Sequence, residues 1–251
     1  MPYADNDGVR IHYRVEGEGP AVVLQHGFTQ CIDDWAEAGY VAALVPYFRV
    51  IRVDARGHGL SDKPHDAAAY PLQSRVNDVV AVLDAVGIER AHFWGYSMGG
   101  WIGFGMAQYA MPRVNRLVIG GQHPYARSFD ANRVAFSKAI VEGIGVFVAS
   151  QEEAHGADSS PALQGRWSNA DLRAYLAASI DRSNLEGILS SMMLPCCLYA
   201  GEADPIFLEV KQAAERIPNA LFFSLPRLNH IQGFYCSQLV MPFVAGFLRA
   251  D

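Results

Sequence analysis

The sequence is poor in charged residues and cysteines, and it has no long apolar run. Only 18% of its 251 residues are charged, and acidic residues outnumber basic ones by 26 to 20, which gives a formal net charge of −6. Since no cluster of lysine and arginine is present, we expect no nucleic-acid partner. No stretch approaches the roughly 18 consecutive apolar residues of a membrane-spanning helix, so we also expect no membrane segment.

The N-terminus and the cysteines favour a reducing setting. Residues 1–17 are polar and lack the apolar stretch of a signal peptide. The spacing of Cys31, Cys196, Cys197 and Cys236 matches no metal motif, and the adjacent pair in a predicted core strand is expected to pack as small apolar residues. The sequence therefore predicts a cytoplasmic protein with no metal and no other cofactor.

Apolar residues are abundant, at 51% of the chain, which suits one α/β domain with a large core. Short apolar runs alternate with helical patterns from residue 21 to residue 119, and this alternation predicts a mostly parallel sheet with helices on both faces. We expect the first strand, where apolar and polar residues alternate, to be an edge strand. The strands expected in this part are 9–15, 21–24, 48–53, 91–96 and 116–119, and the helices are 33–45 and 73–86.

The alternation stops over residues 122–191, which mix short helical pieces with Gly, Ser and Pro. The segment is too long for a simple connection. We predict a helical lid inserted over the strand ends, which would exclude water and shape a pocket. The alternative is that the segment is a structural insertion with no role in substrate selectivity. Residues 1–121 and 192–251 then form the core, with strands at 194–200 and 220–225 and helices at 206–217 and 234–249.

Residues 91–105 carry the main chemical signal. A buried strand runs into Gly-x-Ser-x-Gly at residues 95–99 and then into a helix of small residues, the pattern of a nucleophile elbow. A chance pentapeptide in a glycine-rich chain is the alternative. The turn strains the serine backbone, so its close neighbours must lack a Cβ. The elbow would lift Ser97 Oγ clear of the sheet and leave the Met98 N–H at a helix N-terminus, facing a developing oxyanion.

A serine hydroxyl needs a base to take its proton, and the base needs a carboxylate to orient it. In proteins with this elbow, the acid and then the histidine follow the serine along the chain. Asp204, in the turn after the strand 194–200, is our predicted acid, and Glu202 is its rival. Of the eight histidines, His230 alone follows Asp204 in the sequence, and we predict that it is the base, in a loop at 228–231.

A second oxyanion donor should come from the loop after the strand 21–24, where Gly27 allows an unusual backbone and the Phe28 N–H would join that of Met98. No pair of basic residues marks a charged substrate, which favours a short neutral acyl ester or lactone. The residues that we expect to shape the pocket are His26, Tyr96, Trp101, His123, Tyr125 and Ile231.

Three motifs carry a resemblance to a known family: His-Gly-Phe at 26–28, Asp-Ala-Arg-Gly-His-Gly-Leu-Ser-Asp at 54–62, and Gly-Tyr-Ser-Met-Gly-Gly at 95–100. Over essentially its whole length, the chain resembles the α/β-hydrolase superfamily, in the serine-triad branch that includes small carboxylesterases. The resemblance implies an eight-stranded, mostly parallel sheet, a helical lid, a triad of Ser97, Asp204 and His230, and a chiefly structural loop at 54–62. Epoxide hydrolases and haloalkane dehalogenases have Asp at the elbow, so the serine argues against both.

The sequence thus predicts a serine esterase that cleaves a small carboxylic ester through an acyl-enzyme. A lactonase, a carbon–carbon bond hydrolase or a perhydrolase would use the same triad, and the lid residues decide among them. A hydrolase-fold ligand receptor with little or no turnover is the alternative from another class. We expect a small-molecule ester or lactone as the partner, and the sequence does not indicate an oligomeric state.

Overall fold

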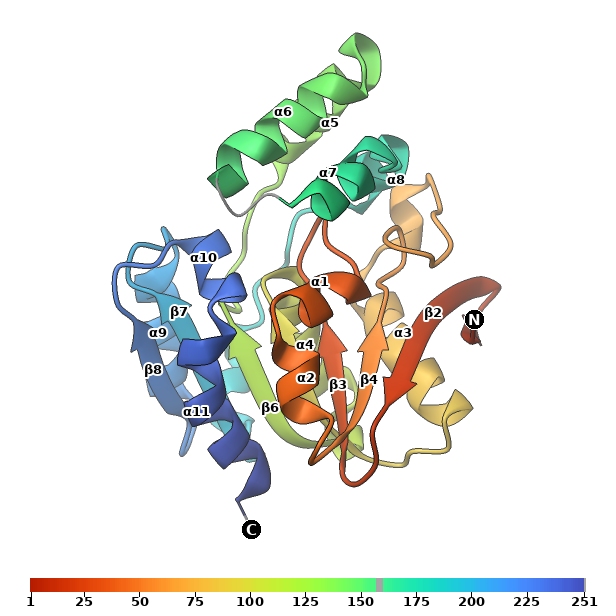
Figure 1. Cartoon of the computed structure of the whole chain (residues 1–251). Coiled ribbons are helices and arrows are strands. Elements are labelled where there is room, and N and C mark those ends of the chain that lie inside the picture. Colours follow the sequence, from red (N-terminus) through yellow and green to blue (C-terminus); the bar gives the residue numbers. More distant parts are fainter. Residues whose placement is uncertain (157–159, 251) are drawn as a thin grey trace.

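The computed structural model describes residues 1–156 and 160–250. One sheet of eight strands, in the order β1-β2-β4-β3-β5-β6-β7-β8, runs through the molecule (Figure 1). Strand β2 is antiparallel to both of its neighbours, and all later pairs are parallel. The strands are β1 (Tyr3–Asn6), β2 (Val9–Glu16), β3 (Ala21–Gln25), β4 (Arg49–Val53), β5 (Ala91–Tyr96), β6 (Val114–Gly120), β7 (Cys196–Gly201) and β8 (Leu221–Leu225).

Helices cover both faces of this sheet. Successive strand residues point to opposite sides, so apolar side chains on both faces need to be buried. Val23 and Ile51 belong to one core cluster and their neighbours Val22 and Val50 to the other. The first face carries α3 (Leu72–Ala85), α4 (Met98–Tyr109) and α9 (Phe207–Arg216). The second carries α1 (Ile32–Glu37), α2 (Tyr40–Leu44), α10 (His230–Tyr235) and α11 (Ser237–Arg249). The predicted α/β class, with a mostly parallel eight-stranded sheet flanked by helices, is confirmed.

Further helices connect β6 to β7: α5 (Asp130–Glu142), α6 (Ile144–His155), α7 (Pro161–Ser168), α8 (Leu172–Ala178) and the 3-10 helix η4 (Glu186–Ser191). In Figure 1, α5 to α8 lie beyond the ends toward which the parallel strands point. They have a small hydrophobic cluster of their own, which includes Phe136, Phe147 and Trp167, and Phe28 of the core packs against it. Two 3-10 turns complete the described elements, η1 (Ala67–Ala69) and η2 (Met111–Arg113).

Four expectations about secondary structure were wrong. The strand at 9–15 is not the edge, since β1 pairs with its outer side; β1 is short and buries Ala4 alone, so it has little apolar pattern. The helix expected at 33–45 is divided by Gly39, whose φ of 87° ends one helix before the next begins. The helix expected at 234–249 is also two helices. His230 lies in the first turn of α10, not in a loop, because Asn229 caps that helix.

Among residues 1–156 and 160–250, no helix combines the length and the apolar character that crossing a membrane would require.

Candidate active site

Ser97 occupies the turn between β5 and α4 with φ 52° and ψ −112°, a strained backbone for a residue with a side chain. Its N–H donates a 2.9 Å hydrogen bond to the Gly120 carbonyl of β6, which anchors the turn. A Cβ at Gly95 would lie 2.0 Å from the Gly99 carbonyl oxygen, and one at Gly99 would lie 2.0 Å from the Gln25 carbonyl oxygen. Both flanking glycines are therefore required by close backbone packing.

The predicted serine, histidine and acid come together from three separate segments. His230 Nε2 lies 2.9 Å from Ser97 Oγ, and His230 Nδ1 lies 2.6 Å from Asp204 Oδ2. The Asp204 side chain is almost fully buried, and its other oxygen accepts a hydrogen bond from the Ile206 N–H. A histidine with its Nδ1 proton held by a carboxylate presents the Nε2 lone pair to the serine hydroxyl. The rival acid, Glu202, instead accepts a 2.8 Å hydrogen bond from the Ser224 hydroxyl.

Two backbone amides near Ser97 are available as donors. Within the described residues, neither the Phe28 N–H nor the Met98 N–H has a hydrogen-bond acceptor. The Gly27 N–H, in contrast, donates to Gln30 Oε1 at 2.8 Å. A Cβ at Gly27 would lie 3.4 Å from Ser97 Cβ, so the loop after β3 passes close to the serine. This is the environment expected of an oxyanion site.

Ser97 opens onto two cavities. The first, of about 250 Å³, is lined by aromatic and apolar residues together with polar ones. The second, of about 280 Å³, shares several residues with the first and extends to two arginines. Both cavities are lined by Phe28, Ser97, Asn132 and His230. The first adds Phe136, Ile231, Phe234 and Tyr235 among others, and the second adds Arg127, Phe129, Arg182 and Ile206.

Of the predicted pocket residues, Tyr96 and Ile231 line the first cavity. His26 lines neither cavity at Ser97, because its ring is buried between two loops. Its Nδ1 lies 2.7 Å from the Gly27 carbonyl and its Nε2 accepts a hydrogen bond from the Ala55 N–H at 3.0 Å. Burial lowers the pKa of His26, which keeps the ring neutral in these contacts. Its placement in the pocket was wrong.

Trp101, His123 and Tyr125 also lie outside the walls of these two cavities. Trp101 is 3% exposed and faces the core, because it is one turn into α4 and on the side that covers the sheet. His123 and Tyr125 stack on each other with ring centroids 5.5 Å apart. His123 was chosen because it follows a strand end, but the direction of its side chain could not be deduced from that position.

The loop 54–62 is organised by buried hydrogen bonds and one buried ion pair. Asp54 Oδ2 lies 2.7 Å from His12 Nδ1, and Asp54 also accepts hydrogen bonds from the backbone N–H groups of Ile32 and Leu60. Arg56 binds Asp78 through two hydrogen bonds of 2.6 and 2.7 Å. These contacts tie the loop to β2, α1 and α3, which fits the structural role implied by the resemblance.

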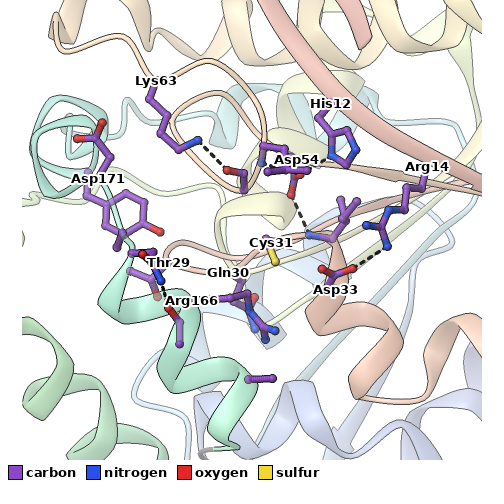
Figure 2. A pocket seen from close by; sticks show the side chains of 18 residues that line it. His12, Arg14, Thr29, Gln30, Cys31, Asp33, Asp54, Lys63, Arg166 and Asp171 are labelled. Carbon is purple, nitrogen blue, oxygen red and sulfur yellow. Dashed lines mark hydrogen bonds and ion pairs between the residues drawn. The ribbon is translucent and has the colours of Figure 1, made fainter. Parts of the chain in front are cut away.

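A larger cavity of about 440 Å³ lies beside the site (Figure 2). It meets the first cavity at Thr29 and Gln30, which line both, but neither Ser97 nor His230 borders it. Its charged groups already have partners. Figure 2 shows Arg14 turned toward Asp33 (3.1 Å), and Lys63 donates to backbone carbonyls.

Within the described residues, no cluster of three or more His, Cys, Asp or Glu side chains is arranged to hold a metal ion. The groups that the structure brings together at Ser97 are a hydroxyl, an imidazole, a carboxylate and two backbone amides.

Comparisons with known proteins agree with this fold. A putative 2-succinyl-6-hydroxy-2,4-cyclohexadiene-1-carboxylate synthase from Bacillus subtilis (strain 168) is 26% identical over 275 residues, covering 98% of this chain and 97% of its own. The 3-oxoadipate enol-lactonase 1 of Acinetobacter baylyi is 27% identical, covering 80% of this chain and 79% of its own. The crystal structure of the enol-lactonase from Burkholderia xenovorans LB400 superimposes with a TM-score of 0.87 at 26% identity, covering 99% of this chain and 100% of its own.

The sequence profile of the alpha/beta hydrolase fold matches residues 20–169, more than half of the chain. That segment contains the loop that carries the Phe28 amide, the loop 54–62 and the Ser97 elbow. The chain belongs to the α/β-hydrolase superfamily.

Proposed function

We propose that this protein is a serine hydrolase that cleaves a small carboxylic ester. The observation that carries the proposal is the relay from Ser97 Oγ to His230 Nε2 (2.9 Å) and from His230 Nδ1 to Asp204 Oδ2 (2.6 Å). A serine hydroxyl is a weak nucleophile unless a neighbouring base accepts its proton, and both distances are short enough for proton transfer and orientation.

In the proposed reaction, Ser97 Oγ attacks the ester carbonyl carbon while His230 Nε2 takes the hydroxyl proton. The carbonyl oxygen becomes an oxyanion that accepts hydrogen bonds from the Phe28 and Met98 amides. Collapse of the tetrahedral intermediate breaks the bond to the alcohol, which leaves with the proton held by His230. Water then attacks the acyl-enzyme by the same route and releases the acid.

A lactone is the second candidate substrate. A lactone is a cyclic ester, so the same steps open its ring, and the acid and alcohol remain in one product. Two of the proteins most similar to this chain are named as enol-lactonases. Their similarity over most of the chain favours this variant of the proposed reaction.

We also propose that helices α5 to α8 act as the lid. Asn132 and Phe136 of α5 and Gln151 of α6 line the first cavity beside Ser97. Gln151 Oε1 accepts a 3.3 Å hydrogen bond from Thr29 Oγ1, in the loop that carries the Phe28 amide. The insertion therefore contacts the loop on which oxyanion stabilisation would depend.

Labelling with a fluorophosphonate tests the activated serine. Wild-type protein should label and should hydrolyse p-nitrophenyl esters of short chain length. Ser97→Ala should do neither, whereas Ser191→Ala, a change at an exposed serine of η4, should behave as wild type. Folded wild-type protein that neither labels nor turns over any ester would overturn the proposal and favour a ligand receptor.

A further inference from the structure

Two arginines from opposite ends of the insertion meet beside Ser97. Arg127 and Arg182 form an isolated antiparallel β-bridge in which each backbone N–H donates to the other's carbonyl, at 3.2 and 2.9 Å. Both side chains line the second cavity together with Ser97 and His230. Arg182 is 7% exposed, whereas Arg127 is exposed at the surface. The bridge therefore sets one buried and one exposed guanidinium along the same cavity.

These arginines belong to an alternating stack of cations and aromatic rings. The Arg182 guanidinium lies 5.1 Å from the ring centroid of Trp101 and 4.8 Å from that of Phe129. Arg127 lies 5.7 Å from the Phe129 ring, and Arg75 lies 5.8 Å from the Trp101 ring. Stacking on aromatic faces holds a guanidinium in place while leaving its N–H groups free to donate.

No carboxylate of the described chain neutralises Arg182. Burial, followed by the nearby charges of Arg127 and Arg75, lowers the pKa of Arg182, and no acidic residue counters this effect. Asp204 is the one acidic residue among the described residues that line this cavity, and it is held by His230. The neighbouring acid Asp181 is already bound, since it lies 2.9 Å from Arg133.

A buried cation without a counter-ion costs free energy unless a ligand supplies the opposite charge. A carboxylate suits this place, because its two oxygens match the planar fork of a guanidinium. A cavity of about 280 Å³ that holds both the arginines and the Ser97–His230 pair gives room for a small molecule with a carboxylate at one end and an ester at the other.

We infer that Arg182 and Arg127 bind a carboxylate of the substrate, so that the substrate class is a small ester or lactone bearing a free carboxylate. The ester part of this inference rests on the proposed function, whereas the carboxylate site does not. It differs from the neutral acyl ester or lactone that the sequence favours, a preference based on the lack of paired basic groups in the sequence.

Two esters of equal chain length test the inference: mono-p-nitrophenyl glutarate, which is anionic, and p-nitrophenyl valerate, which is neutral. Wild-type protein should have the higher kcat/KM for the glutarate ester. Arg182→Gln should lower the ratio of the two kcat/KM values about 10- to 100-fold, the usual range for a lost charge-assisted hydrogen bond. Arg182→Lys should retain part of the preference. A wild-type protein without preference, or an unchanged ratio in Arg182→Gln, would overturn the inference.

Arg173→Gln is the matched control, because it removes the same charge from an exposed site on α8 and should leave the ratio unchanged. Arg127→Gln gives a second test at an exposed position, where folding is not in question, and should also lower the ratio.

Calorimetric titration with glutarate separates the two proposals. Ser97→Ala should bind glutarate and Ser97→Ala/Arg182→Gln should not. Glutarate binding in a protein that hydrolyses no ester would support the carboxylate site and reject the hydrolase. Ester turnover without glutarate binding and without preference for the anionic ester would reject the carboxylate site and leave the hydrolase standing.

Discussion

The Tyr96 hydroxyl donates a 2.6 Å hydrogen bond to the backbone carbonyl of His230. Tyr96 directly precedes Ser97 at the end of β5, so the strand that carries the serine also holds the first residue of α10. Burial raises the pKa of Tyr96 well above its usual range, which keeps the hydroxyl protonated as a donor. A Cβ at Gly233 would lie 2.8 Å from this hydroxyl, so α10 packs tightly onto it.

Tyr96→Phe should therefore reduce catalysis without unfolding the protein. The lost hydrogen bond frees the backbone at His230, and we expect kcat to fall about 2- to 10-fold, the rate equivalent of one net hydrogen bond. Steady-state kinetics on a short p-nitrophenyl ester give the measurement. Tyr199→Phe is the control, since the Tyr199 hydroxyl accepts from Trp94 Nε1 away from the histidine. Equal kcat for Tyr96→Phe and wild type would show that the contact does not position His230.

Strain at Ser97 predicts a difference between two inactive variants. Ser97→Gly and Ser97→Ala both lose the hydroxyl, but only glycine adopts φ 52° and ψ −112° without strain. We expect the free energy of unfolding of Ser97→Gly to exceed that of Ser97→Ala by about 1 kcal/mol, despite the greater entropy of glycine in the unfolded chain. Urea denaturation of both variants measures it. A Ser97→Ala variant that is the more stable of the two would contradict the idea that the elbow stores strain.

An ion-pair cluster fastens the insertion to the core. Arg166 of α7 lies 2.6 Å from Glu37 and 3.1 Å from Asp34, whose side chain is fully buried; Figure 2 shows Arg166 among the residues that line the larger cavity. Arg166→Ala should lower the free energy of unfolding by about 1–3 kcal/mol, because a buried carboxylate loses its cation. Arg166→Lys should recover part of this loss, since an ammonium lacks the fork that spans both acids.

Limited proteolysis distinguishes a local from a global effect of Arg166→Ala. If the cluster fastens the insertion, cleavage within residues 122–191 should become faster than cleavage of the core. Uniform cleavage with an unchanged melting temperature would show that the insertion is held by other contacts.

Acid should destabilise the fold through its buried histidines. Burial lowers the pKa of His26, His58 and His123, and that of His92 to about 4. Histidines in the unfolded chain are protonated near pH 6.5, whereas these four stay neutral in the folded protein until the pH is lower. The unfolded state then binds more protons, so stability is lost as the pH falls below about 6.5, by up to about 1.4 kcal/mol per pH unit for each histidine.

Urea midpoints between pH 7.5 and pH 4.5 measure this loss. His92→Gln removes one of the four histidines and should reduce the change of the urea midpoint with pH. A midpoint that stays constant down to pH 5 would show that the histidines are protonated equally in both states.

Short sequence patterns predicted much of the candidate site. The elbow needs glycines at two set distances from the serine and lies between a strand and a helix, so residues 91–105 show it without any tertiary information. The chain order of serine, acid and histidine then left few candidates, and the structure brings Ser97, Asp204 and His230 within hydrogen-bonding distance. The parallel sheet was equally accessible, because buried strands and amphipathic helices alternate with clear periods.

Weak or absent local signals explain the errors. Strand β1 is polar and pairs along one side only, so nothing in its own residues distinguishes it from a loop. The breaks at Gly39 and at Cys236 interrupt patterns that read as continuous helices. The direction of Trp101 depends on which face of α4 meets the sheet, and that of His26 depends on the backbone groups of two loops that its ring contacts. A residue's position along the chain decides neither.

The sequence by itself therefore determined the α/β class, the elbow and the three residues placed for a serine mechanism, since each depends on short patterns or on chain order. Tertiary structure alone decided which side chains line the cavity beside them. Arg127 and Arg182 are far apart in the chain, and a single backbone bridge makes them neighbours. Whether a cation is neutralised depends on its distance from the acidic side chains that the fold brings near it. No local sequence pattern encodes the distance between residues that are far apart in the chain.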